Sequence, residues 1–90
     1  ENLVESSEKK DLYSVVGPVC ETADSFGSDF EVSANAGDYL VVYSAGAYGS
    51  SMGSNYNTRL KPAEILVDQK SHKVIRKAET FDDLIKEEEL

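Results

Sequence analysis

Apolar residues occur along this chain in short runs that are separated by glycine, proline, asparagine and aspartate. Five runs contain β-branched or aromatic residues and have the length of strands in small β-proteins. They cover residues 12–16, 30–32, 39–45, 63–68 and 73–78. The run 39–45 is apolar at successive positions, which is typical of a strand covered on both faces within a sheet. The pattern predicts an all-β sandwich or small barrel.

The segments between these runs contain turn residues, and one short helix is predicted near the end of the chain. Residues 22–29 are polar and predict a loop, and 35–38 (Asn-Ala-Gly-Asp) predict a turn. The last two predicted strands form a hairpin around 69–72. Thr80 is a candidate N-cap, because acidic residues fill the next turn and apolar residues follow at helical spacing. The prediction is therefore an all-β fold with a short C-terminal helix.

Residues 46–57 (GAYGSSMGSNYN) contain three glycines, three serines, two asparagines and two tyrosines. Glycines let backbone N–H groups approach an anion, and hydroxyl groups add further donors. The side chains of Tyr48 and Tyr56 supply flat contact surface with a polar end. This composition predicts a ligand-facing loop. The alternative is a glycine-rich hairpin connection in which both tyrosines are packed.

Length and charge exclude several classes of protein. The chain has 90 residues, of which 40% are hydrophobic, and this predicts one domain with a modest core. Its net charge of −8 opposes binding to nucleic acid or to an anionic membrane, because no basic stripe can neutralise phosphates. No apolar run approaches the ~20 residues of a membrane-spanning helix. The charged start at 1–10 argues against an intact secretory signal.

The single cysteine, the single histidine and the spacing of possible metal ligands limit the kinds of site that the chain can form. Cys20 is the single cysteine, so we expect a free thiol and a reducing, cytoplasmic location. His72 is the single histidine and lies among polar residues in the predicted turn, which indicates a surface position. Paired metal ligands at a usable spacing are missing, so we expect no metal site.

Four segments resemble one enzyme family when they are taken in order. They are 17–26 (GPVCETADSF), 46–57, Arg59 and 62–67 (PAEILV). Together they resemble the C-terminal domain of diaminopimelate decarboxylase, a fold-type III pyridoxal-phosphate enzyme. The resemblance covers roughly residues 13–84. It implies that the chain is one C-terminal β-domain of a larger decarboxylase, and that a preceding (β/α)8 barrel is absent here.

The resemblance also implies a fold and an activity. The family's domain is a Greek-key β-barrel or sandwich like the C-terminal domain of alanine racemase. The family converts meso-diaminopimelate to L-lysine and CO2, the last step of lysine biosynthesis, as a homodimer with pyridoxal 5'-phosphate (PLP). The lysine that binds PLP lies on the barrel, so the chain alone is expected to be inactive. Tyr48 matches the tyrosine that contacts the PLP phosphate and borders the substrate site, and Tyr56 matches an aromatic residue of the substrate pocket.

The pair Cys20 and Glu21 carries the most specific implication of the resemblance. In the family this pair enters the active site of the partner subunit, where the cysteine lies near the reacting carbon and the carboxylate binds the distal amino group of the substrate. A carboxylate offers an ammonium group a charge-assisted hydrogen bond. The family has glycine more often than alanine at Ala23 and serine more often than threonine at Thr22.

Two alternatives from other classes remain. An ornithine or arginine decarboxylase would share the fold, although the ornithine enzymes resembled here carry an aspartate where this chain has Glu21. A free-standing β-module that binds a partner protein through its sheet edge is the non-catalytic alternative.

Overall fold

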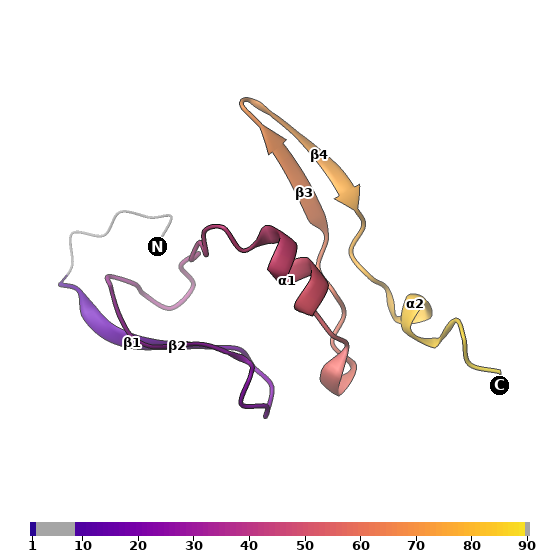
Figure 1. Cartoon of the computed structure of the whole chain (residues 1–90), viewed down its shortest axis with the longest axis horizontal. Helices are drawn as coiled ribbons and strands as arrows, with labels where there is room; N and C mark the ends of the chain where they lie inside the picture. The colour runs from indigo at the N-terminus through magenta and orange to yellow at the C-terminus, as the bar shows by residue number, and fades with distance from the viewer. Residues whose placement is uncertain (2–8, 90) are drawn as a thin grey trace. The chain divides into compact units, whose positions relative to one another are not determined.

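A computed structural model of the chain describes residues 1 and 9–89. They form two antiparallel hairpins, two short α-helices and one 3-10 helix (Figure 1). In chain order the elements are β1 (Asp11–Val16), β2 (Ser25–Val32), α1 (Gly46–Met52), the 3-10 helix η1 (Tyr56–Thr58), β3 (Glu64–Asp68), β4 (Ser71–Arg76) and α2 (Phe81–Ile85). The chain divides into two units, Glu1–Gly49 and Ser50–Leu90.

The hairpin of the first unit pairs β1 with β2. The strand predicted at 12–16 is confirmed as β1, whereas the loop predicted over 22–29 is wrong in its second half, because β2 begins at Ser25. The pairing slips between Tyr13 and Val15, and the opposite strand adopts positive φ angles at Gly27 (118°) and Asp29 (62°). A β-bulge absorbs extra residues in this way. The polar residues that predicted a loop therefore lie in an irregular part of a strand.

The strand predicted over 39–45 does not form. Only Leu40 has an isolated β-bridge, and the chain turns at Tyr43 and Ser44. Ser44 has a φ of 55°, in the left-handed region that a regular strand does not contain. Val41 nevertheless exchanges two backbone hydrogen bonds with Glu1, at 2.6 and 2.9 Å. The β-branched and aromatic residues of 39–45 predicted a strand, but strand propensity depends strongly on the neighbouring strands available for pairing.

The glycine-rich stretch 46–57 is helical in its first part, so the prediction of a continuous loop was wrong. Helix α1 covers Gly46–Met52, and the N–H of Gly49 donates to the carbonyl oxygen of Ala45 at 2.6 Å. Glycine disfavours a helix by only about 1 kcal/mol relative to alanine. Two glycines therefore do not prevent one where the surrounding chain favours it.

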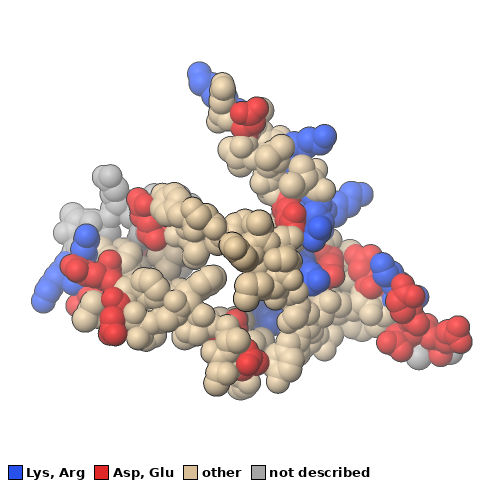
Figure 2. Space-filling model, in the orientation of Figure 1, with Lys and Arg blue, Asp and Glu red and all other residues tan. Residues whose placement is uncertain are grey.

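The second unit contains a hairpin and a helix in the predicted part of the chain, but β4 covers Ser71–Arg76 instead of 73–78, so the turn predicted at 69–72 is shorter and His72 lies in the strand. Strands β3 and β4 pair in register from Ile65 to Asp68, and Gln69 and Lys70 form a two-residue turn. Helix α2 begins after Thr80, whose hydroxyl group accepts a hydrogen bond from the N–H of Asp83. The Asp83 carboxylate accepts one from the N–H of Thr80, which completes a capping box. Figure 2 shows acidic side chains gathered over α2 and the residues after it.

None of the described residues is buried, so the predicted modest core is wrong for this part of the chain. Each sheet has two strands, and a two-stranded sheet leaves both of its faces open unless another layer covers them. Phe26, Tyr39, Val67 and many other large apolar side chains are exposed. The structure therefore consists mostly of small antiparallel sheets, with no closed barrel among the described residues.

Candidate functional site

The loop between β1 and β2 is held closed by Asp24. The N–H of Gly17 donates to the Asp24 carbonyl oxygen at 2.8 Å, and the N–H of Val19 donates to the Asp24 carboxylate at 2.9 Å. This carboxylate occupies the space beside the α-carbon of Gly17. A Cβ atom at position 17 would lie 2.1 Å from both carboxylate oxygens, far inside van der Waals contact. Any larger residue at position 17 would therefore displace the Asp24 carboxylate from its present place.

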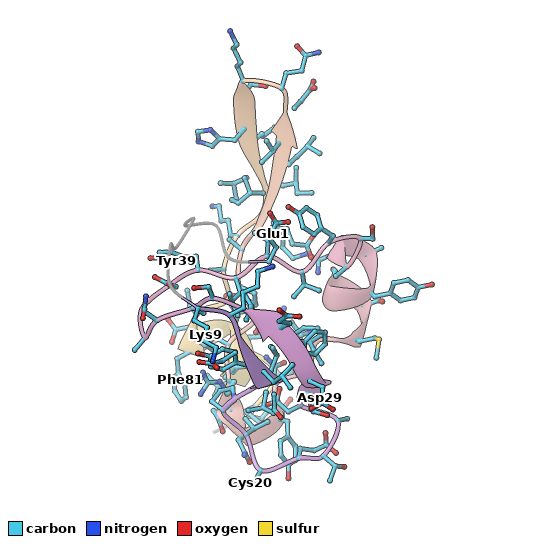
Figure 3. All side chains as sticks on the ribbon, turned by 90° about the vertical axis from the view of Figure 1, so that its left-hand side faces the viewer. Glu1, Lys9, Cys20, Asp29, Tyr39 and Phe81 are labelled. Atoms are coloured by element: carbon cyan, nitrogen blue, oxygen red, sulfur yellow. The ribbon has the colours of Figure 1, made fainter. Side chains whose placement is uncertain are left out.

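Cys20 and Glu21, the pair that the resemblance assigns to the active site of a partner subunit, both lie on this loop. Cys20 has an exposed free thiol at the turn of the loop (Figure 3). The Glu21 carboxylate accepts hydrogen bonds from the N–H of Ala23 at 2.7 Å and from the Thr22 hydroxyl at 3.4 Å. Ala23 does not have a positive φ, so a residue with a Cβ fits where the family more often has glycine. Hydrogen bonds within the loop thus order it, and Cys20 and Glu21 are both exposed.

Tyr48 lies in the middle of α1, and its side chain is 71% exposed. A Cβ atom added at Gly46 or Gly49 would meet nothing within 4 Å. The two glycines therefore leave space beside them on α1, on which the Tyr48 side chain is exposed.

Tyr56 belongs to the second unit and is the first residue of η1, where its side chain is 53% exposed. The two residues after it have positive φ angles, 55° at Asn57 and 61° at Thr58. Asn55 precedes Tyr56 and donates from Nδ2 to the carbonyl oxygen of Arg59 at 2.9 Å. The backbone around Tyr56 is therefore sharply turned, and Asn55 spans the turn.

Glu79 was not singled out from the sequence, yet its carboxylate contacts Asn55, the residue before Tyr56. One of its carboxylate oxygens accepts from Asn55 Nδ2 at 2.6 Å and from the N–H of Lys61 at 2.7 Å. The Lys61 N–H, together with the Asn55 amide, lowers the pKa of Glu79 below its usual value. Its partners lie 18 and 24 residues away along the chain, so no local pattern could have indicated this role.

A second polar cluster joins α1 to the base of the β3–β4 hairpin. Glu64 begins β3, and its carboxylate accepts a hydrogen bond from the Ser50 hydroxyl of α1. Arg76 ends β4 and lies 3.2 Å from the same Glu64 oxygen, and it also donates to the Ser50 hydroxyl at 3.4 Å. The three side chains therefore fix the end of α1 to the hairpin.

The first unit contains an apolar groove of about 450 Å³ beside β2. It is lined by Glu1, Val15, Phe26, Phe30, Glu31, Val32, Leu40, Val41, Val42 and Tyr43. A hydrogen bond to the Glu1 carboxylate raises the pKa of Tyr43, another of the lining residues. None of the predicted site residues lines this groove, and its apolar walls suit apolar side chains better than a charged amino acid. We therefore assign the candidate site to the loops and not to the groove.

The predicted site residues are thus distributed over three segments. Cys20 and Glu21 share one loop, Tyr48 lies on α1 in the same unit, and Tyr56 lies in the second unit. Across residues 1 and 9–89, no three histidine, cysteine, aspartate or glutamate side chains form a group that could hold a metal ion. No helix within that part of the chain has the length and apolarity needed to cross a membrane.

Comparison with known proteins identifies relatives over most of the chain. It is 53% identical over 76 residues to the diaminopimelate decarboxylase of Haemophilus influenzae, a match that covers 84% of this chain and 18% of that enzyme. It is 46% identical over 83 residues to the corresponding enzyme of Neisseria meningitidis, covering 88% and 20% of the two chains. The chain thus spans about a fifth of the length of these curated relatives.

Solved structures agree with the sequence relatives. Diaminopimelate decarboxylase from Helicobacter pylori, in complex with L-lysine, is 40% identical with a TM-score of 0.81, and the match covers 94% of this chain and 21% of that one. The enzyme from M. jannaschii, also in complex with L-lysine, is 40% identical with a TM-score of 0.82 and covers 91% and 19%. Residues 1–46, half of the chain, match the family described as pyridoxal-dependent decarboxylase, C-terminal sheet domain. The chain therefore belongs to the family of pyridoxal-dependent decarboxylases, within their C-terminal sheet domain.

Proposed function

We propose that this chain is the C-terminal domain of a PLP-dependent diaminopimelate decarboxylase and supplies substrate and cofactor contacts to its active site. The observation that carries the proposal is the ordered loop 17–24, which presents an exposed Cys20 beside Glu21. Its relatives over most of the chain are named diaminopimelate decarboxylases. The reaction would convert meso-diaminopimelate to L-lysine and CO2.

Glu21 is suited to bind the distal ammonium group of the substrate. An ionised carboxylate has about four acceptor positions, and Glu21 uses its two oxygens for the N–H of Ala23 and the hydroxyl of Thr22. These contacts orient the carboxylate and leave it acceptor capacity for an ammonium group. The two relatives of known structure named above bind L-lysine, which carries a side-chain ammonium group. Binding through Glu21 would be a charge-assisted hydrogen bond.

Cys20 is proposed to lie near the reacting carbon in the active site of a partner subunit. A loop that is ordered by its own hydrogen bonds keeps its conformation when it projects into another chain. This arrangement implies a homodimer in which each subunit completes the site of the other. The thiol is exposed here, as a residue that acts outside its own domain must be.

Tyr48 fits a contact to the phosphate of PLP. Its side chain is exposed on α1, a tyrosine hydroxyl is a group that donates hydrogen bonds to phosphate oxygens, and Gly46 and Gly49 leave room beside it. When bound, PLP supplies the electron sink that decarboxylation requires. Tyr56 would line the substrate pocket. Both residues bind and orient groups that come from outside this chain.

The rest of the enzyme would also complete the fold. We propose that residues 1–90 are one domain, and that a PLP-binding (β/α)8 barrel and further strands in the complete enzyme close it into a Greek-key barrel or sandwich. The exposed apolar side chains and the apolar groove of the first unit support this proposal. Apolar surface of this extent is typical of a contact with another protein segment.

A chimeric enzyme tests the proposed function directly. The segment of the Haemophilus influenzae decarboxylase that matches this chain would be replaced by residues 1–90, and the purified chimera would be assayed with meso-diaminopimelate, L-ornithine and L-arginine. We expect PLP binding and CO2 release from meso-diaminopimelate alone. Preference for ornithine or arginine would contradict the substrate. A folded chimera that retains PLP but decarboxylates none of the three would contradict the function.

Two variants of the chimera separate the proposed roles. Glu21→Gln keeps the shape of the side chain but removes its charge, so KM for meso-diaminopimelate should rise by about tenfold or more, as expected for a lost charge-assisted contact. PLP retention should not change in this variant. Tyr48→Phe removes the hydroxyl group and should weaken PLP retention, measured by absorbance after dialysis. Unchanged turnover in Glu21→Gln would contradict the role of Glu21.

A further inference from the structure

Glu79 connects the residue before Tyr56 to the segment that follows β4. One carboxylate oxygen of Glu79 accepts from Asn55 Nδ2 at 2.6 Å and from the N–H of Lys61 at 2.7 Å. The N–H of Glu79 donates to the Lys61 carbonyl oxygen at 3.0 Å, so both backbone and side chain of Glu79 contact this region. Hydrogen bonds to an ionised carboxylate are shorter and stronger than those between neutral groups. Asn55 is therefore held by Glu79, which lies 24 residues later in the chain and outside the turn that follows Asn55.

The backbone that follows Tyr56 adopts a conformation that costs free energy. Asn57 and Thr58 both have φ angles in the left-handed region, at 55° and 61°. For a β-branched residue such as threonine this region is a clear outlier. Conformations of this kind persist where surrounding contacts determine them, and they concentrate at functional sites. Asn55 also donates to the Arg59 carbonyl oxygen at 2.9 Å, so it bridges the two ends of the strained turn.

We propose that Glu79 is a positioning residue that sets the direction of the Tyr56 side chain through Asn55. The inference rests on the proposed role of Tyr56 as a substrate contact. The Tyr56 side chain is 53% exposed, so the packing of this chain alone leaves it much freedom. Its direction is set instead by the backbone of η1, and Asn55 with its partner Glu79 determines where that backbone begins.

The substitutions at Glu79 test the carboxylate oxygen that accepts hydrogen bonds from both Asn55 and Lys61. Glu79→Gln can place its amide oxygen where both donors now meet, so it keeps the two hydrogen bonds and loses only the charge. Glu79→Ala removes the acceptor altogether. Glu87→Ala is the matched control, because it removes an exposed carboxylate of the same unit that lies in the stretch after α2. All variants are made in the chimera, with 3-fluorotyrosine incorporated at position 56 for the spectroscopic measurement.

Two readouts are needed. The 19F signal of position 56 should shift or broaden in Glu79→Ala and stay unchanged in Glu79→Gln and Glu87→Ala. KM for meso-diaminopimelate should rise by up to about tenfold in Glu79→Ala, because the contribution of a hydrogen bond to a charged group limits how strongly the loss can act through Tyr56. It should rise less than about threefold in Glu79→Gln, which keeps both hydrogen bonds. PLP retention should be the same in all of these variants.

A double-variant measurement separates positioning from a general structural role. If Glu79 acts through Tyr56, Glu79→Ala should add little to the KM of Tyr56→Ala, because coupled residues are not additive. An unchanged 19F signal in Glu79→Ala, or the full rise in KM in the Tyr56→Ala background, would overturn the inference. If the 19F signal shifts but Tyr56→Ala leaves KM unchanged, Glu79 does position Tyr56, and only the substrate role of Tyr56 fails.

Discussion

Gly17→Ala is the sharpest test of how the Cys20–Glu21 loop is built. The change adds one Cβ atom, which would lie 2.1 Å from each carboxylate oxygen of Asp24. Ordinary van der Waals contact with such an atom begins near 3.4 Å. The carboxylate must therefore move by more than 1 Å (3.4 minus 2.1 Å is 1.3 Å). Moving it breaks the hydrogen bond that it accepts from the N–H of Val19 at 2.9 Å.

The expected cost follows from that broken bond. A hydrogen bond to a charged acceptor contributes about 1.5–3 kcal/mol. Because ~1.4 kcal/mol corresponds to a factor of ten, hydrogen exchange at the Val19 amide should become about tenfold faster or more. The loop carries Cys20 and Glu21, so KM for meso-diaminopimelate should rise in the same variant.

Hydrogen exchange measured by mass spectrometry on the chimera, over the peptide 17–24, checks this prediction. Gly49→Ala is the steric control, because its added Cβ atom meets nothing within 4 Å and should leave exchange in this peptide unchanged. Asp24→Ala removes the carboxylate that causes the clash. The double variant should exchange no faster than Asp24→Ala alone, since both changes act on one contact. Additive effects, or unchanged exchange in Gly17→Ala, would refute the reasoning.

Two further predictions concern the second unit, and hydrogen exchange on the chimera measures both. Gln69 has a φ of 51°, which glycine adopts at little cost, so Gln69→Gly should stabilise the β3–β4 hairpin against local opening by about 0.5–1 kcal/mol. Lys70→Gly, at a position without positive φ, should destabilise it, and the opposite order would contradict the assignment of the turn. Thr80→Ala should lower the protection of α2 by about 1 kcal/mol, because the cap is lost. The N–H and hydroxyl groups of Thr80 lower the pKa of Asp83, so this cap is complete above the ordinary pKa of about 3.9 and weakens as pH falls through the lowered value. The difference between wild type and Thr80→Ala should therefore shrink in acid, and a constant difference would count against the capping box.

Features that depend on near neighbours could be predicted from the sequence. The cap at Thr80 needs only Asp83, three residues later, and the turn predicted at 35–38 is closed by a hydrogen bond from the N–H of Asp38 to the carbonyl oxygen of Asn35. The β3–β4 hairpin likewise joins adjacent segments. Each of these rests on side chains and backbone groups that are close in sequence, so local patterns contain the whole signal.

Features that depend on distant partners could not be predicted in the same way. Residues 39–45 have the composition of a central strand, but Ser44 turns the chain and no regular sheet includes them. Glu79 was missed because its partner Asn55 lies 24 residues before it. The resemblance to decarboxylases, in contrast, indicated Cys20 and Glu21 as a pair. Their roles in substrate binding and across a dimer stay predictions.

The β3–β4 hairpin has exposed apolar side chains, and the segment that follows it contains Glu79, the residue proposed to position Tyr56. Successive residues of a strand point to opposite faces, and Ile65, Leu66 and Val67 are all at least 48% exposed, so both faces of β3 are apolar. A two-stranded hairpin is marginal in water by itself, so this one requires a covering layer on each face. Once covered, the hairpin is rigid, and the segment that leaves β4 carries Glu79. If Glu79 positions Tyr56 as proposed, a substitution that loosens the packing of this hairpin should therefore also alter the 19F signal of position 56.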